Sequence, residues 1–124
     1  MERVHFLVVE DDLAVQRAIK KALAAVGLRS TLATSGDEAI ALFNDEGKFE
    51  YQAVLTDINL LGSLNGWDVA LAARKIDPSV PIIYMSGDRT DEWASKGVSN
   101  SIMLSKPFSL DRLLTAISQL TNAR

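Results

Sequence analysis

Cysteine is absent from the 124-residue sequence, and histidine occurs only once, as His5. Without cysteine there can be no disulfide bond, thiol nucleophile or thiolate metal site. A single histidine excludes a multi-histidine metal site and most histidine-based catalytic triads. We expect His5, which opens an apolar run, to have a structural role.

Long apolar runs and an excess of positive charge are lacking as well. The net charge of −3 gives no electrostatic basis for binding nucleic acid. No apolar stretch approaches the length of a bilayer span, and the N-terminus lacks the pattern of a signal peptide. These absences predict a cytoplasmic protein that binds neither nucleic acid nor membrane.

Several motifs of phosphate-handling and hydrolytic enzymes are also missing. The sequence has no Gly-x-x-x-x-Gly-Lys-Ser/Thr loop, no Gly-x-Gly-x-x-Gly after a strand and no Gly-x-Ser-x-Gly elbow. The segment Asp57-Ile58-Asn59 lacks the second aspartate of the Asp-x-Asp signature of haloacid dehalogenase-type phosphatases. A P-loop nucleotide hydrolase is therefore excluded, and a phosphatase of that type is disfavoured.

Short apolar runs alternate with stretches of helical period along the whole chain. Its length and its 48% apolar content suit one globular domain, which we expect over residues 1–124. Strands are expected at about 6–9, 29–33, 52–57, 81–86 and 101–105. Helices are expected from about 13 to 26, from 36 to 43, from 67 to 76, at 91–96 and from 110 to 120, with caps at Asp12, Ser35 and Ser109.

The five strand–helix units predict an α/β fold. Continuous rather than alternating apolar strands indicate a parallel sheet with helices on both faces. Right-handed crossovers favour a doubly wound, flavodoxin-like sheet of order 2-1-3-4-5. In such sheets the ligand lies beyond the carboxyl ends of strands 1 and 3, where this sequence has Glu10-Asp11 and Asp57.

Clustered carboxylates at one sheet edge require a proton or a cation. At a separation of about 5 Å, each pair repels by roughly 3 kcal/mol at an effective dielectric constant near 20. Oxygen-only ligands that leave room for water suit Mg²⁺, or Mn²⁺, better than Zn²⁺. The ligands we predict are Asp11, Asp57 and the carbonyl oxygen of Asn59, with Glu10 binding directly or through water. An acid at a strand end can also simply cap the next helix, which is what we expect of Asp12.

Asp57 is the candidate nucleophile, because a carboxylate can accept a phosphoryl group as an acyl phosphate. A loop rather than a helix follows it, which argues against a capping role. Lys106 can neutralise phosphoryl oxygens, Ser86 can donate its hydroxyl, and Gly87 can donate its main-chain amide. Taken singly, a lysine is more often a solvated surface residue and Ser-Gly more often a plain turn.

With these residues together, the chain resembles the receiver domain of two-component response regulators over about residues 4–120. Glu10 and Asp11 resemble the acidic pair of that family, Asp57 its phosphoacceptor, Ser86 its serine or threonine, and Lys106 its lysine. The resemblance implies a cis peptide bond before Pro107. It also implies phosphorylation by a sensor histidine kinase or a histidine phosphotransfer protein, and by small donors such as acetyl phosphate.

The resemblance also assigns roles to residues around these five. Asn59 and Asp88 occupy the positions that tune the lifetime of the acyl phosphate, and their polarity suggests a labile phosphate. Met103 stands where the family usually has a switch aromatic residue. Trp93, in a short and polar fourth helix, is expected to pack in the core, with a role as an exposed partner contact as the alternative.

We therefore expect a receiver-only signalling domain, a monomer or weak dimer, which assists its own phosphorylation and is not a turnover enzyme. Phosphorylation would change its protein contacts, with an unknown downstream target and no output domain. A receiver-like adaptor that works without phosphorylation is one alternative. A small magnesium-dependent phosphatase with an aspartyl-phosphate intermediate is another.

Overall fold

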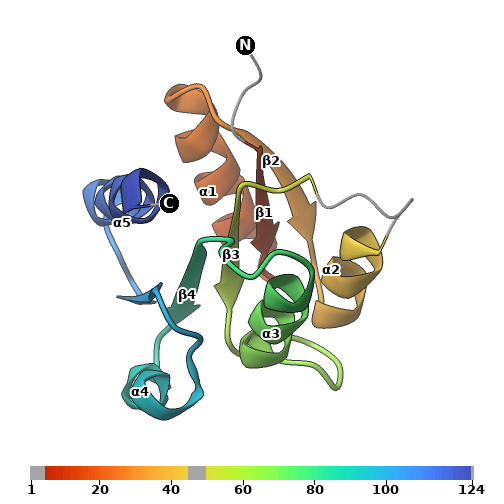
Figure 1. Cartoon of the computed structure of the whole chain (residues 1–124). Helices are drawn as coiled ribbons and strands as arrows, with labels where there is room; N and C mark the ends of the chain where they lie inside the picture. Colours follow the sequence, from red (N-terminus) through yellow and green to blue (C-terminus); the bar gives the residue numbers. More distant parts are fainter. Residues whose placement is uncertain (1–4, 45–49, 124) are drawn as a thin grey trace.

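The computed structural model describes residues 5–44 and 50–123, and the side chains up to residue 120. Five parallel strands form one sheet in the order β2-β1-β3-β4-β5, as the sequence predicts (Figure 1). The strands are β1 (His5–Val9), β2 (Arg29–Ala33), β3 (Ala53–Asp57), β4 (Ile82–Ser86) and β5 (Ser101–Ser105).

A helical segment follows each strand. These segments are α1 (Leu13–Ala25), α2 (Gly36–Phe43), α3 (Gly66–Ile76), the 3₁₀ helix η2 (Thr90–Glu92), α4 (Trp93–Lys96) and α5 (Leu110–Ala123). The predicted fourth helix is therefore a 3₁₀ turn followed by a single α-helical turn. Within the described ranges, no helix has the length and apolar character needed to cross a membrane.

The sheet separates two hydrophobic cores. On one face Leu7, Val54 and Tyr84 pack with residues of α2 and α3, and on the other Phe6 and Leu55 pack with residues of α1 and α5. Figure 1 shows the same arrangement of helix pairs on the two sides of the sheet. Because both faces are covered, β1, β3 and β4 are buried almost throughout, which explains their continuous apolar sequences.

Side-chain caps fix where the helices begin. Asp12 accepts hydrogen bonds from the main-chain amides of Ala14 and Val15, at 2.9 and 3.2 Å, and so caps α1 as predicted. The hydroxyl of Ser35 caps α2 by accepting from the amide of Glu38 at 3.1 Å. Ser35 and Glu38 have the spacing of a capping box, but among the described contacts the Glu38 carboxylate accepts from the Thr34 hydroxyl, at 2.9 Å, and not from the amide of Ser35.

A complete capping box instead starts α3. Asn65 accepts from the amide of Asp68 at 3.0 Å, and the Asp68 carboxylate accepts from the amide of Asn65 at 2.9 Å. Gly66 follows, and it packs so closely that a Cβ atom there would overlap the carbonyl oxygen of Asp57. The start of α3 is thereby set directly against the end of β3, where the candidate site begins.

The prediction that Trp93 packs in the core is wrong. The residue is 38% exposed, and its indole N–H donates to the hydroxyl of Ser101 at 2.9 Å. A single α-helical turn is too short to bury one face, and α4 contributes no buried residue to either core. Trp67 in α3 is buried in the core as expected, with its ring centroid 4.7 Å from that of Tyr84.

Candidate functional site

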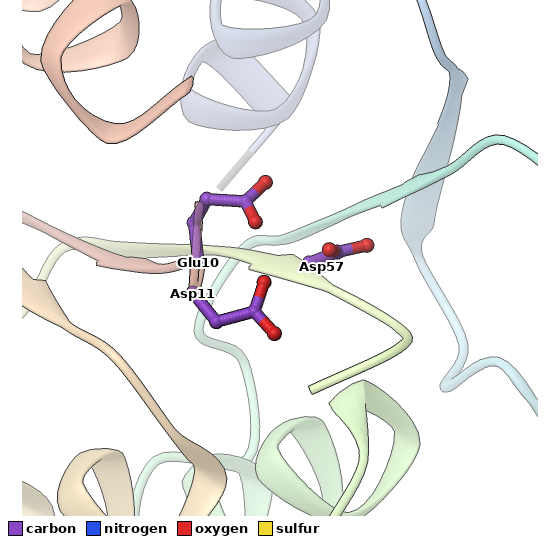
Figure 2. A group of neighbouring side chains, drawn as sticks. All are labelled: Glu10, Asp11 and Asp57. Carbon is purple, nitrogen blue, oxygen red and sulfur yellow. The ribbon is translucent and has the colours of Figure 1, made fainter. Parts of the chain in front are cut away.

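Three carboxylates meet at the carboxyl edge of the sheet. Glu10 and Asp11 follow β1, Asp57 ends β3, and one oxygen of each lies within 4.8 Å of the others. Figure 2 shows the two residues that follow β1 beside Asp57. Glu10 is 1% exposed and Asp57 8% exposed, so the cluster is set into the protein rather than spread on its surface. The strand order therefore brings together the acids predicted from the sequence.

Lys106 reaches this cluster from the end of β5. Its ammonium nitrogen lies 2.6 Å from Oε1 of Glu10 and 3.2 Å from Oδ2 of Asp57. Burial alone would lower the pKa of Lys106, but the hydrogen bond that its ammonium donates to Glu10 and the negative charges of Asp57 and Glu10 outweigh burial and raise the pKa. The lysine is therefore a cation that links the two strand ends, and not a solvated surface residue.

Asp11 is the least compensated of the three acids. Burial, the hydrogen bond with Glu10 and the negative charge of Glu10 raise the pKa of its carboxyl group, and these effects exceed the opposing effects of a main-chain hydrogen bond and of the positive charge of Lys106. A divalent cation beside Asp11 would relieve this repulsion. The donor atoms contributed by the cluster are all carboxylate oxygens, the ligands that Mg²⁺ prefers. The residues present thus fit the predicted metal.

Main-chain hydrogen bonds hold the carboxylates in place. The amide of Asp12 donates to Oε2 of Glu10 at 3.2 Å, and the amide of Ile58 donates to Oδ1 of Asp57 at 2.8 Å. The side-chain amide of Gln16, a buried residue of α1, donates to the carbonyl oxygen of Glu10. The sequence reasoning missed Gln16, although its place three residues before the buried Ile19 puts it on the inward face of the helix.

Ser86 ends β4 at the same edge and is 1% exposed. Its oxygen accepts from the amide of Arg89 at 2.8 Å and from the amide of Asp88 at 3.3 Å, and its hydroxyl donates to Oδ1 of Asp88 at 3.3 Å. The amide of Lys106 donates to the carbonyl oxygen of Ser86 at 2.8 Å. Among the described residues, no hydrogen bond joins the Ser86 hydroxyl to Asp57, so this group is near the site but engaged elsewhere.

Asn59 and Asp88 contact each other across the mouth of the site. The side-chain amide of Asn59 donates to Oδ1 of Asp88 at 2.9 Å, and both residues are exposed. The guanidinium of Arg89 donates to the amide oxygen of Asn59 at 3.2 Å. The sequence reasoning missed Arg89. The metal-ligand role of the Asn59 carbonyl oxygen, and the donor role of the Gly87 amide, stay predictions.

Met103 lies on β5 directly opposite Tyr84 of β4 and is partly buried against the core that contains Tyr84. The Tyr84 hydroxyl accepts from the amide of Val98 at 3.0 Å, so this buried tyrosine connects β4 with the segment before β5. Burial raises the pKa of Tyr84 despite that hydrogen bond. Where the family usually has a switch aromatic residue, this chain therefore has the thioether of Met103, which lies beside Tyr84 of the neighbouring strand.

The peptide bond between Lys106 and Pro107 is cis, as the family resemblance implies. Residues 6–118 match the family model described as the response regulator receiver domain. The crystal structure of a response regulator receiver protein from Sinorhizobium medicae is 40% identical, with a TM-score of 0.93, and the match covers 98% of this chain and 97% of that one.

Two further matches place the chain among known proteins. The uncharacterized transcriptional regulatory protein YkoG of Bacillus subtilis is 29% identical over 119 residues, which are 94% of this chain and 50% of that protein. The receiver domain of the sensor histidine kinase PA1611 of Pseudomonas aeruginosa has a TM-score of 0.81 at 24% identity, covers 98% of this chain and 99% of its own, and has a magnesium ion coordinated in its active site cleft. Five curated relatives are matched over only 21% to 56% of their own lengths.

Proposed function

Because this chain belongs to the response regulator receiver domain family, we propose that it accepts a phosphoryl group on Asp57 in two-component signal transduction. Receiver domains are signalling domains that histidine kinases phosphorylate. The donor would be the phosphohistidine of a sensor kinase or of a histidine phosphotransfer protein.

The observation that carries the proposal is the position of the Lys106 ammonium between two strand ends. It contacts Asp57 at 3.2 Å and Glu10 at 2.6 Å, within a cluster whose carboxylate oxygens lie within 4.8 Å of one another. A surface lysine or a helix-capping aspartate would not need this arrangement. A site that must hold the negative charge of a transferring phosphoryl group does need it.

In the proposed step, an oxygen of the Asp57 carboxylate attacks the phosphorus atom of the donor. A P–O bond to Asp57 forms while the P–N bond to the donor histidine breaks, and the imidazole leaves with the bonding electron pair. Oδ1 of Asp57 accepts from the Ile58 amide, whereas Oδ2 faces Lys106. Lys106 would neutralise the incoming phosphoryl oxygens, and Ser86 would rotate its hydroxyl from Asp88 toward them.

Receiver domains bind Mg²⁺ at an acidic pocket, and the corresponding acidic cluster here is Glu10, Asp11 and Asp57. We propose that these residues, with the carbonyl oxygen of Asn59, hold Mg²⁺ or Mn²⁺. The magnesium ion in the receiver domain of PA1611 supports this. When bound, the ion would neutralise charge that develops on the phosphoryl oxygens.

A further feature of the proposal concerns the stability of the phosphorylated product. The polar pair Asn59 and Asp88 could place an attacking water, so the acyl phosphate should be labile, and a half-life of many hours with Mg²⁺ would contradict this.

We also propose that the chain acts in the cytoplasm as a single receiver domain, as a monomer or weak dimer. It would use its own residues to assist phosphorylation and dephosphorylation and would not turn over a separate substrate.

The direct test is incubation with acetyl phosphate and Mg²⁺, followed by intact-mass measurement. Wild-type protein should gain the mass of one phosphoryl group, which hydroxylamine removes, and should gain none when EDTA replaces Mg²⁺. The variant Asp57→Asn should gain none. The matched control is Asp12→Asn, which changes a neighbouring acid that caps α1 and should leave phosphorylation intact.

A phosphoryl group that persists in Asp57→Asn at the wild-type level would reject the proposal. No addition to wild-type protein would instead favour the adaptor that works without phosphorylation. Repeated hydrolysis of a phosphomonoester, with many product molecules per chain, would favour the phosphatase.

A further inference from the structure

Arg89 contacts two of the segments that surround the candidate site, the end of β4 and the loop after β3. Its main-chain amide donates to Oγ of Ser86 at 2.8 Å, and its guanidinium Nη1 donates to the side-chain oxygen of Asn59 at 3.2 Å. Ser86 ends β4, whereas Asn59 lies in the loop after β3, thirty residues from Arg89 along the chain. The residue therefore joins the two strand ends that flank the proposed phosphoryl group.

The other edge of the same guanidinium holds the start of α4. Nε and Nη2 donate to the two carboxylate oxygens of Glu92, at 2.8 and 3.0 Å, which is a bidentate pair. Glu92 also accepts from the ammonium group of Lys96 at 2.5 Å. One planar group thus connects the site to the η2–α4 segment through fixed geometry.

Transfer of a phosphoryl group would disturb both contacts that Arg89 makes with the site. The Ser86 hydroxyl donates a hydrogen bond to Asp88 and accepts one from the main-chain amide of Arg89. In the proposed function, this hydroxyl must turn toward the phosphoryl oxygens. The carboxylate of Asp88 would lose that donor, and its remaining side-chain partner is Asn59, the residue that Arg89 holds. A rotation of the Ser86 hydroxyl would therefore affect Arg89 in two ways: at its main-chain amide, which donates to Ser86, and at its guanidinium, which donates to Asn59.

The core offers a weaker alternative route. Met103 occupies the place of the usual switch aromatic, and a thioether cannot rotate as a rigid ring into space vacated by Ser86. Tyr84, the aromatic residue opposite Met103, is fully buried between Trp67 and the amide of Val98. Polar contacts on the surface, in contrast, can change without repacking that core.

The structure assigns a positioning role to Arg89: its guanidinium, bridging Asn59 and Glu92, transmits the phosphorylation of Asp57 to α4. This inference rests on the proposed function. Arginine is required for it, because a lysine ammonium cannot contact Asn59 and both oxygens of Glu92 in one plane. The indole of Trp93, directly after Glu92, is a reporter built into the receiving segment.

The test uses the full chain labelled with 5-fluorotryptophan and followed by ¹⁹F NMR. Beryllofluoride with Mg²⁺ serves as the mimic of the phosphoryl group, and the variant Trp93→Phe assigns the two resonances. Wild-type protein should show a shift of the Trp93 resonance on addition of beryllofluoride. That shift should be lost in Arg89→Gln, Arg89→Lys and Glu92→Gln. The Trp67 resonance, from the core, should keep its wild-type position and shows that each variant is folded.

Lys96→Met is the matched control, because it removes the other cation of Glu92 and leaves the Arg89 bridge intact. Its Trp93 resonance should shift as in the wild type. A full wild-type shift in Arg89→Gln would overturn the role of Arg89, and so would loss of the shift in Lys96→Met. Intact-mass measurement with acetyl phosphate runs in parallel. Absence of any acyl phosphate in wild-type protein would reject the proposed function itself and this inference with it.

Discussion

Replacing Lys106 by methionine would remove the cation that compensates the acidic cluster while keeping most of the aliphatic stem. One oxygen of each carboxylate lies within 4.8 Å of the others, and at that limit two unit charges repel by about 3.5 kcal/mol at an effective dielectric constant of about 20. Loss of one partner from a buried ion pair typically costs about 3–5 kcal/mol. The Lys106 side chain is 24% exposed, so solvent screening reduces this value, and we expect the free energy of unfolding to fall by about 2 kcal/mol.

Urea unfolding followed by circular dichroism measures this loss. With an m-value of about 2 kcal/mol/M, the midpoint of Lys106→Met should lie about 1 M below that of the wild type. Saturating Mg²⁺ should narrow the difference, because a bound divalent cation would supply the charge that the variant lacks. Lys96→Met, which removes an exposed lysine paired with Glu92, should unfold like the wild type.

The pH dependence of the same difference has a defined sign. The pKa of Lys106 is raised above its usual value of 10.5, so its stabilising effect should be complete below that pH. The effect should disappear as the pH rises through the raised pKa, and the two proteins should then converge. A difference that is insensitive to both Mg²⁺ and alkaline pH would refute the electrostatic reasoning and point to lost packing of the stem.

Three other predictions concern single positions. Gly66→Ala should lower the free energy of unfolding, measured in urea, by about 1–3 kcal/mol, because the new Cβ would lie 2.9 Å from the Cα of Ile58 as well as against the carbonyl oxygen of Asp57. Gly87→Ala is the control and should be neutral, because the nearest atom to its Cβ would be 3.9 Å away. The hydrogen bond with Arg89, and then the one with Lys96, lower the pKa of Glu92 from 4.5 to about 2. Carboxyl ¹³C NMR should therefore show the ion pair intact above pH 4.5 and lost as the pH falls through about 2. An unchanged pKa of Glu92 in Arg89→Gln would contradict this origin. Trp67→Phe should cost only about 1 kcal/mol, because the buried indole N–H has no hydrogen-bond partner among the described residues; a loss of about 3–5 kcal/mol, as for removal of the whole ring, would contradict that reasoning.

The fold and the acidic cluster could be predicted because burial on both faces of a parallel sheet leaves a local pattern. The strand that ends at Val9 and the strand that ends at Asp57 are continuous apolar runs for this reason, and their polar ends mark one edge of the sheet. The order of the strands then follows from right-handed crossovers. From these rules alone, Glu10, Asp57 and Lys106 are expected to lie at one edge of the sheet.

The contacts around Arg89 could not be predicted in this way. Its bond to Asn59 joins two loops that are thirty residues apart, and its place beside Glu92 depends on the turn that η2 makes. The exposure of Trp93 has a similar origin. A helix of four residues has no apolar face from which burial could be predicted, and Gly97 lies so close to the indole that a Cβ atom there would overlap it.

The segment formed by η2 and α4 has a consequence for how the domain opens. Neither helix, both lying wholly in the described part of the chain, contributes a buried residue to the two cores. Native-state hydrogen exchange should therefore find that its amides exchange through local opening at a small fraction of the global free energy of unfolding, while the amides of β1 and β3 exchange only by complete unfolding. The domain would thus consist of one cooperatively folded unit and the η2–α4 segment, which can rearrange without unfolding of that unit.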